Sequence, residues 1–186
     1  MSEKRPGIDI VLKRISEIDK PVVVDIGAYI GKIGRLCREV NPNTIVHAIE
    51  PEPENYKLIK GSYVYNYAIG YPERMVSFYV INRKEQKGSS QSNSLYPIKN
   101  SKKIKVKCIT LSRFLKENNI KHIDLLKINC EGGEYEIFGS NVSFLSIIDM
   151  IFMSLHIPKK NKKIFDILKF YGFKLISDRK WQIWVK

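Results

Sequence analysis

The chain has 186 residues and a formal net charge of +13, and 44% of its residues are hydrophobic. This hydrophobic content excludes a disordered chain, and the length suits one globular domain with a sizeable core. The apolar runs are too short to span a bilayer, and the first residues lack the apolar core of a signal peptide. We therefore expect a cytoplasmic protein without a transmembrane segment.

Predicted strands and helices alternate along the chain. We expect strands at residues 21–25, 44–50, 63–68, 75–81, 105–110, 123–129, 147–157, 173–177 and 181–185. We expect helices at residues 7–18, 32–40, 51–62, 111–119 and 159–171, and one that starts near residue 133. This alternation predicts an α/β domain with a mostly parallel sheet, helices on both faces and an antiparallel C-terminal hairpin.

We expect a single domain over residues 1–186, with an N-terminal helix within residues 1–20. The segment at 82–101 is polar and rich in Ser, Lys and Asn, which is typical of a loop or a lid. Ser92 and Ser94 lie in it, and an ordinary solvated loop is the simpler interpretation of both.

The basic charge has two interpretations. Lysines cluster at residues 84–87, 99–107 and 159–163, and such a field attracts nucleic acid, anionic lipid or acidic substrates. A merely solvated surface is an equal alternative, because no compact stripe of arginine and aromatic residues accompanies the charge. The three cysteines include no C-x-x-C pair, and neither His47 nor His122 has metal-ligand spacing, so we expect reduced thiols and no metal site.

The most informative segment is Pro-Val-Val-Val-Asp-Ile-Gly-Ala-Tyr-Ile-Gly at residues 21–31. It predicts a buried strand ending at Asp25, a tight turn through Gly27 and Gly31, and the start of a helix. The next strand ends at Glu50, about 20 residues further on, where dinucleotide folds place the acid that binds ribose hydroxyls. This pattern indicates a nucleotide cleft between two parallel strands.

The same segment argues against a dinucleotide. The G-x-G-x-x-G fingerprint needs a glycine where Tyr29 stands, and Asp25 would point a negative charge at the pyrophosphate. S-adenosylmethionine has an ammonium, a sulfonium and a ribose but no phosphate. Asp25 therefore suits its methionine end, directly or through water, and Glu50 suits its ribose. The alternative is an aspartate that only caps the turn and a solvated glutamate.

Ligands of such sheets bind beyond the carboxyl ends of the strands. We therefore expect several polar side chains to gather at that edge. They are Asp25, Glu50, Asn66, Asn129 and His156.

Eight segments, in order along most of the chain, resemble the FkbM-type S-adenosylmethionine-dependent methyltransferases. They are residues 23–31, 48–55, 66–70, 76–80, 93–97, 109–115, 123–134 and 154–157. The segment Ile-Asp-Leu-Leu-Lys-Ile-Asn-Cys-Glu-Gly-Gly-Glu at 123–134 is the most specific of them. The resemblance implies a class I, Rossmann-like methyltransferase sheet with its final strand inserted antiparallel, and S-adenosyl-L-methionine as the cofactor.

The resemblance also implies cofactor contacts at the first turn, at the end of the second strand and near the adenine. The predicted cofactor-binding residues are Asp25, Gly27, Ala28, Tyr29, Gly31, Glu50, Asn66 and Ala68. The family usually has Asp at 129 and Ala at 133, and often Glu at 154, where this chain has Asn129, Gly133 and Ser154. These departures leave cofactor binding intact, but they leave open which acceptor is methylated.

Methyl transfer to a hydroxyl requires alignment of the reactants and removal of the hydroxyl proton. His156 is the first candidate base, because it ends a predicted central strand and histidine titrates near neutral pH; a structural hydrogen bond beneath the cleft is its alternative role. Glu131 can hold the methionine ammonium, orient an acceptor or cap the next helix. Asn129 cannot act as a base and can only position a bound group, and Glu134 suits the first turn of that helix.

Three functions remain open. The first is O-methylation of a hydroxyl on a small molecule or sugar. The second is methylation of nucleic acid, RNA in particular, which the charge favours, although residues 129–132 lack the Asn/Asp-Pro-Pro-Tyr/Trp motif of amino-methylating enzymes. The third is a catalytically silent cofactor-binding protein, since Asn129 and Ser154 replace acids. Because the chain is short for the family, either a large acceptor is partly covered or a second subunit of a homo-oligomer completes the pocket.

Overall fold

The computed structural model describes residues 7–81, 93–95, 97, 99–178 and 181–186. Its main sheet has seven strands in the order β3-β2-β1-β7-β8-β10-β9. In chain order these are β1 (Val22–Ile26), β2 (Ile45–Ile49), β3 (Tyr63–Tyr65), β7 (Leu125–Ile128), β8 (Met150–Met153), β9 (Lys174–Asp178) and β10 (Gln182–Val185). Neighbouring strands are parallel, except that β10 runs antiparallel to β8 and β9. The predicted α/β fold with an antiparallel C-terminal hairpin is confirmed.

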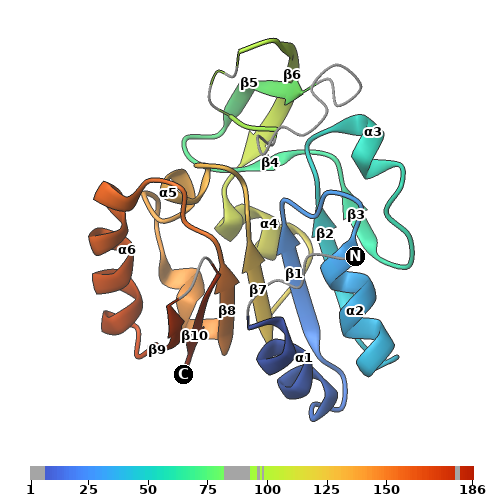
Figure 1. The fold of residues 1–186 in the computed structure, drawn as a ribbon, viewed down its shortest axis with the longest axis vertical. Helices are drawn as coiled ribbons and strands as arrows, with labels where there is room; N and C mark the ends of the chain where they lie inside the picture. Colours follow the sequence, from blue (N-terminus) through green and yellow to red (C-terminus); the bar gives the residue numbers. More distant parts are fainter. Residues whose placement is uncertain (1–6, 82–92, 96, 98, 179–180) are drawn as a thin grey trace.

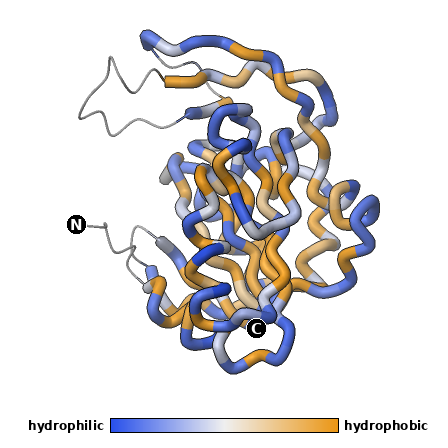
Figure 2. Tube along the Cα trace, turned by 90° about the vertical axis from the view of Figure 1, so that its right-hand side faces the viewer, coloured by the Kyte–Doolittle hydropathy of each residue, from blue (hydrophilic) through white to orange (hydrophobic). Residues whose placement is uncertain are grey.

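Helices cover both faces of the main sheet, as Figure 1 shows. One face carries α1 (Ile8–Ser16) and α2 (Lys32–Val40), and the other carries α4 (Leu111–Glu117), the 3-10 helix η1 (Ser143–Ile147) and α6 (Pro158–Phe170). Because side chains alternate along a strand, Val23 packs with the first group and Val24 with the second. Hydrophobic segments therefore concentrate in the middle of the molecule (Figure 2). Among the described residues, no helix has the length and apolar character needed to cross a membrane.

A small second sheet stands beyond the carboxyl ends of the main strands (Figure 1). It contains β4 (Ala68–Ile69), β6 (Ser101–Ile109) and β5 (Arg74–Ile81), in that order. Alternate residues of β5 and β6, among them Val76, Phe78 and Val106, form a core of their own on its inner face. Two short helices, α3 (Pro53–Tyr56) and α5 (Glu134–Ile137), lie at the same end. The small sheet and these two helices therefore cover the carboxyl edge of the main sheet.

Four predicted elements are wrong in extent, and one of them is the strand expected at 105–110, which begins at Ser101. The strand expected at 63–68 is two strands, because the chain leaves the main sheet after Tyr65 and then pairs with β6. The strand expected at 147–157 is only β8, since Ile147 ends η1 and the chain turns away after Ser154. The helix expected at 51–62 stops at Tyr56, and Gly61 then adopts a left-handed conformation with φ 65°. The predicted loop or lid at 82–101 lies largely outside the described residues.

Candidate active site

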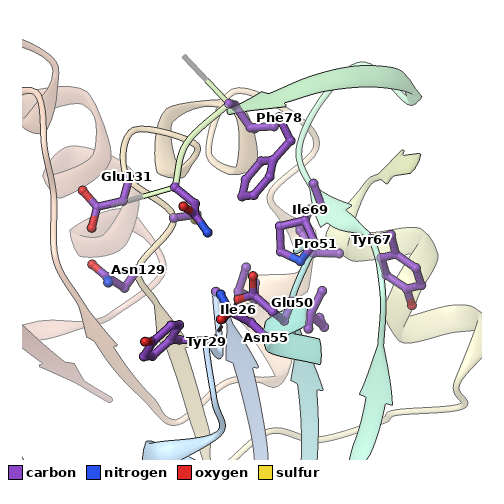
Figure 3. Close-up of a pocket in the computed structure, with 16 residues that line it drawn as sticks. Ile26, Tyr29, Glu50, Pro51, Asn55, Tyr67, Ile69, Phe78, Asn129 and Glu131 are labelled. Atoms are coloured by element: carbon purple, nitrogen blue, oxygen red, sulfur yellow. Dashed lines mark hydrogen bonds between the residues drawn. The ribbon is translucent and has the colours of Figure 1, made fainter. Parts of the chain in front are cut away.

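A cavity of about 330 Å³ opens at the carboxyl ends of β1, β2 and β7, beneath the small sheet. Its size falls in the usual range of small-molecule sites. Figure 3 shows Phe78 reaching into it from β5, Tyr67 on one side, and Asn129 and Glu131 on the other. The lining residues are Ile26, Gly27, Tyr29, Ile49, Glu50, Pro51, Asn55, Tyr67, Ala68, Ile69, Phe78, Asn93, Leu95, Asn129, Cys130 and Glu131.

The turn after β1 is built around a close approach of two backbones. Gly27 has φ 71°, and a Cβ placed on it would lie 2.1 Å from the carbonyl oxygen of Asn129. The Gly27 amide donates to Ile49 O at 3.0 Å, so the turn is fastened to β2 as well as pressed against β7. Tyr29 also has a left-handed φ of 57°. Only glycine fits at position 27, because any side chain would collide with the backbone of the turn that follows β7.

Glu50 follows β2 directly and is 5% exposed. Its Oε2 accepts the Tyr29 amide at 2.8 Å, and its Oε1 accepts the Glu52 amide at 3.0 Å. Burial nevertheless raises the pKa of Glu50 to about 7, an effect that these two amides oppose. The carboxylate therefore faces the cavity already oriented, with lone pairs left for further donors from a ligand.

Asp25 does not line the cavity. Its carboxylate is 1% exposed and forms an ion pair with Lys127, with 2.8 Å between Oδ1 and Nζ. The two residues are Cα partners in the register of β1 and β7. Lys127 Nζ also donates to the Gly27 carbonyl at 2.6 Å. Asp25 thus acts on the site indirectly, through the lysine that holds the glycine turn.

A second turn, after β7, is held by the buried Glu134, which is 0% exposed. Its two carboxylate oxygens accept the amides of Cys130 and Gly132, each at 2.8 Å. Glu131 has a left-handed φ of 49°, and its carbonyl accepts the Ser94 hydroxyl at 2.9 Å. These bonds fix the turn that places Glu131 at the rim of the cavity, where its carboxylate points outward (Figure 3).

His156 lies behind Glu131 and does not line the cavity. Its Nδ1 is 3.1 Å from Glu134 Oε1, and its Nε2 is 3.3 Å from Glu131 Oε2. The Glu134 carboxylate can accept an N–H from Nδ1, and the Glu131 carboxylate lies on the Nε2 side of the same ring. His156 thus joins two acids of the second turn, through a hydrogen bond to Glu134 and an ion-pair contact with Glu131 at the rim of the cavity.

The cavity has an acidic character. Glu50 and Glu131 are its two carboxylates, and none of its described lining residues is lysine, arginine or histidine. Just outside, Glu52 accepts the side-chain amides of Asn55 and Asn93. Burial, together with the nearby Glu134 carboxylate, raises the pKa of the Cys130 thiol well above its ordinary value, so the thiol stays protonated at neutral pH. The site favours a ligand that is cationic and rich in hydrogen-bond donors.

The structure brings some predicted site residues to the cavity and leaves others away from it. Lining it are Gly27, Tyr29, Glu50, Ala68, Asn129 and Glu131. Outside the lining are Asp25, Ala28, Gly31, Asn66 and His156. Ala28 packs in the core under α2, and Gly31 begins α2 with φ 74°. The Asn66 side chain donates to the backbone carbonyls of Glu50 and Pro51, so it fastens the chain after β2 and does not line the cavity.

Sequence reasoning missed the supporting groups. Lys127 stands inside an apolar strand, where a charge must find a partner, and that signal was available in the sequence. Glu134 was expected as a first-turn acid, but its burial and its bond to His156 were not foreseen. Tyr67, Phe78 and Asn93 reach the cavity because the small sheet folds over it, which no local pattern indicates. Ser92 lies outside the described residues.

Comparison with known proteins gives matches at two levels. A family described as "Methyltransferase FkbM domain" matches residues 25–175. A solved FkbM methyltransferase from Methylobacillus flagellatus is similar with a TM-score of 0.59 and 12% identity, over 90% of this chain and 44% of that one. A precorrin-6y C5,15-methyltransferase from Geobacter metallireducens is similar with a TM-score of 0.54 and 14% identity, over 99% and 89% of the two chains.

A third structure, assigned as an RNA methyltransferase from Pyrococcus horikoshii, has a TM-score of 0.50 and 14% identity, over 96% and 80% of the two chains. At these identities the structural likeness establishes the fold alone. The chain spans less than half of the length of the M. flagellatus protein. No curated protein matches this chain.

Proposed function

This chain belongs to the FkbM methyltransferase family, and on that premise we propose that it transfers a methyl group from S-adenosylmethionine to a hydroxyl of a small molecule or sugar. The observation that carries the proposal is the acidic cavity at the carboxyl edge, where Glu50 is held by two backbone amides. A phosphate-bearing cofactor would meet Glu50 and Glu131 there without a compensating cation among the described lining residues. A sulfonium cofactor meets charges of the opposite sign.

The residues present fit this cofactor. Glu50 can accept two ribose hydroxyls, since its carboxylate lies at the strand end where such folds bind ribose. The side chains of Ile49, Tyr67 and Ile69 offer apolar contact to an adenine, and Asn129 and Glu131 lie toward the other end of the cavity. Bound S-adenosylmethionine supplies an electrophilic methyl group and a good leaving group. The protein's own part is therefore to align the acceptor and to take up its proton.

We assign proton uptake to the chain of Glu131, His156 and Glu134. At the rim of the cavity Glu131 would meet the acceptor hydroxyl and take up its proton when the methyl–sulfur bond of the cofactor is replaced by a methyl–oxygen bond. The proton passes to the pair of Glu131 and His156, joined at 3.3 Å, while Glu134 fixes the imidazole through Nδ1. Glu131 is thus the catalytic residue of this proposal, and His156 and Glu134 are positioning residues.

Cofactor binding is expected to weaken as the pH falls. Because the pKa of Glu50 is raised to about 7, the side chain must lose a proton before both oxygens accept ribose hydroxyls. With that pKa, the ionised fraction falls about tenfold between pH 8 and pH 6, and affinity for S-adenosylhomocysteine falls with it. Calorimetry across this range, in two buffers of different ionisation enthalpy, measures both the affinity and the released proton.

Two variants give this titration its controls. Glu50→Gln is expected to bind weakly at every pH and to release no proton, because the amide does not titrate. Glu54→Gln removes an exposed carboxylate of α3 that pairs with Lys57, and is expected to keep the wild-type profile. An unchanged pH profile in Glu50→Gln would show that another group controls binding.

His156→Gln is expected to lower kcat by about 100-fold or more while leaving cofactor affinity unchanged. The variant loses the imidazole that positions Glu131, but the His156 side chain does not line the cavity. The measurement is labelled methyl transfer to a panel of polyhydroxylated small molecules and sugars, with calorimetry for S-adenosylhomocysteine. His122→Gln changes a histidine that precedes β7, away from the cavity, and should match the wild type. Full activity in His156→Gln would remove the residue from the mechanism.

A second candidate function is methylation of RNA. It is favoured by the outer face of the small sheet, where the exposed Lys103, Lys105 and Lys107 pair in register with Tyr79, Ser77 and Met75 of β5. Binding of RNA with a steep salt dependence, followed by labelled methyl transfer to it, would promote this candidate. Salt-insensitive or absent binding would dismiss it.

A further inference from the structure

A second cavity, of about 600 Å³, lies between α5 and α6. Its wall is apolar where Tyr135, Phe138, Ile164 and Ile167 contribute. Its rim is basic and carries four exposed lysines, which are Lys159, Lys160, Lys162 and Lys163. We call this cavity the lysine groove. It combines a surface for a flat or apolar moiety with a dense positive charge.

The lysine groove adjoins the proton-uptake chain. Tyr135, in its wall, follows Glu134 in sequence, and its hydroxyl accepts the Ile157 amide at 2.7 Å and donates to Asn161 Oδ1 at 2.7 Å. Ile157 follows His156 and precedes α6. The groove and the Glu131–His156 pair therefore share the same short stretch of chain, at the edge of the sheet where α5 and the start of α6 lie (Figure 1).

The charge of the groove is free to act on a ligand. Within the described part of the chain, none of its four lysines forms an ion pair, and Lys160 Nζ lies 5.5 Å from the centre of the Tyr135 ring. Asp166 is the one acidic residue among the described lining residues, so the rim carries a net positive charge. This sign is opposite to that of the cofactor cavity, and the two sites thus favour ligands of opposite charge.

The lysines of the groove also lie close together. Lys159 and Lys163 are separated by about 6 Å along the axis of α6, because each residue of a helix rises 1.5 Å. That span matches one phosphate or diphosphate group better than the extended backbone of a polynucleotide. The aromatic wall beside it can contact a sugar ring or a base.

We propose that the lysine groove binds a phosphate or diphosphate of the acceptor, so that the substrate is a phosphorylated or nucleotide-linked sugar. This inference rests on the proposed function, since it places the anionic part of the acceptor beside Glu131 and His156. The acidic cavity holds the cofactor, and the basic groove holds the acceptor by its phosphate. A hydroxyl of the attached sugar then reaches the methyl group.

The test uses calorimetry on the full chain with sodium pyrophosphate, glucose 1-phosphate, UDP-glucose and glucose. The groove variant is Lys160→Gln with Lys163→Gln. The matched control is Lys116→Gln with Lys121→Gln, which removes the same charge from exposed residues in and after α4. Pyrophosphate is expected to bind the wild type and the control alike, and to bind the groove variant about tenfold more weakly. Glucose is expected not to bind, and the relative affinities of the other two probes distinguish a sugar phosphate from a sugar nucleotide.

Equal pyrophosphate affinity in all three proteins, or none in any, would overturn the proposal. Binding of a short single-stranded RNA to the wild type, without binding of pyrophosphate, would also overturn the proposal, because the lysines would then bind a polynucleotide. S-adenosylhomocysteine is titrated into the same samples and is expected to bind all three equally. Loss of that binding with the pyrophosphate pattern intact would contradict the proposed function and leave the groove standing as an anion site.

Discussion

Gly27→Ala is expected to abolish binding of S-adenosylhomocysteine and to destabilise the fold severely. The new Cβ would lie 2.1 Å from the Asn129 carbonyl oxygen, which belongs to the backbone of the neighbouring turn and cannot rotate away. One of the two turns must therefore move, and both line the cavity in which we propose that the cofactor binds. The left-handed φ of 71° adds a further cost of about 1 kcal/mol. Calorimetry with S-adenosylhomocysteine and thermal unfolding measure the two effects.

Gly172→Ala is the matched control for this substitution. Gly172 has a similar φ of 86°, but a Cβ placed there meets no atom within 4 Å. The control is expected to lose only about 1 kcal/mol of stability, from the backbone conformation, and to keep its affinity for the cofactor. Similar behaviour of the two variants would show that backbone conformation matters at position 27 and the close approach of the turns does not.

Lys127→Met is expected to lower the free energy of unfolding by about 3–5 kcal/mol, because it leaves the Asp25 carboxylate buried and unpaired. The pair is nearly inaccessible to water, with side-chain exposures of 1% for Asp25 and 2% for Lys127. A domain has about 5–15 kcal/mol of stability in total, so the variant approaches the limit of folding. Urea denaturation followed by circular dichroism gives the value.

Two further variants sharpen this test. Arg35→Met breaks the ion pair between Arg35 and Glu39, whose side chains are 58% and 57% exposed. It is expected to lower the free energy of unfolding by less than about 1 kcal/mol. The double variant Asp25→Leu with Lys127→Met removes both buried charges and is expected to recover much of the loss, because no unpaired charge remains. If Lys127→Met were as stable as Arg35→Met, the buried pair would not support the glycine turn.

The sequence predicted the turn after β1 and the carboxylate that follows β2, because each of these features is local. The glycines of residues 27 and 31, and the position of Glu50 after an apolar strand, leave few alternatives for the chain. The sequence did not predict that Asp25 turns toward Lys127. That contact depends on the register of two strands about 100 residues apart, and register follows from the packing of the whole sheet.

The small sheet shows a different limit of sequence reasoning. Residues 63–68 have the composition of one strand, and nothing in them indicates that the chain changes sheet after Tyr65. Because of that change Ala68 and Ile69 reach the cavity, whereas the Asn66 side chain bonds back to the chain after β2. His156 was expected at the edge of the cleft, but it lies behind Glu131 and outside the cavity lining, and the left-handed φ of Glu131 that sets this arrangement has no sequence signature.

A crystal structure of the protein with S-adenosylhomocysteine bound would show directly whether Glu50 holds the ribose. We predict the ribose hydroxyls within hydrogen-bond distance of the Glu50 carboxylate, the adenine beside Tyr67 and Ile69, and the sulfur facing Glu131. Ligand density elsewhere, or a ribose that makes no contact with Glu50, would contradict this prediction.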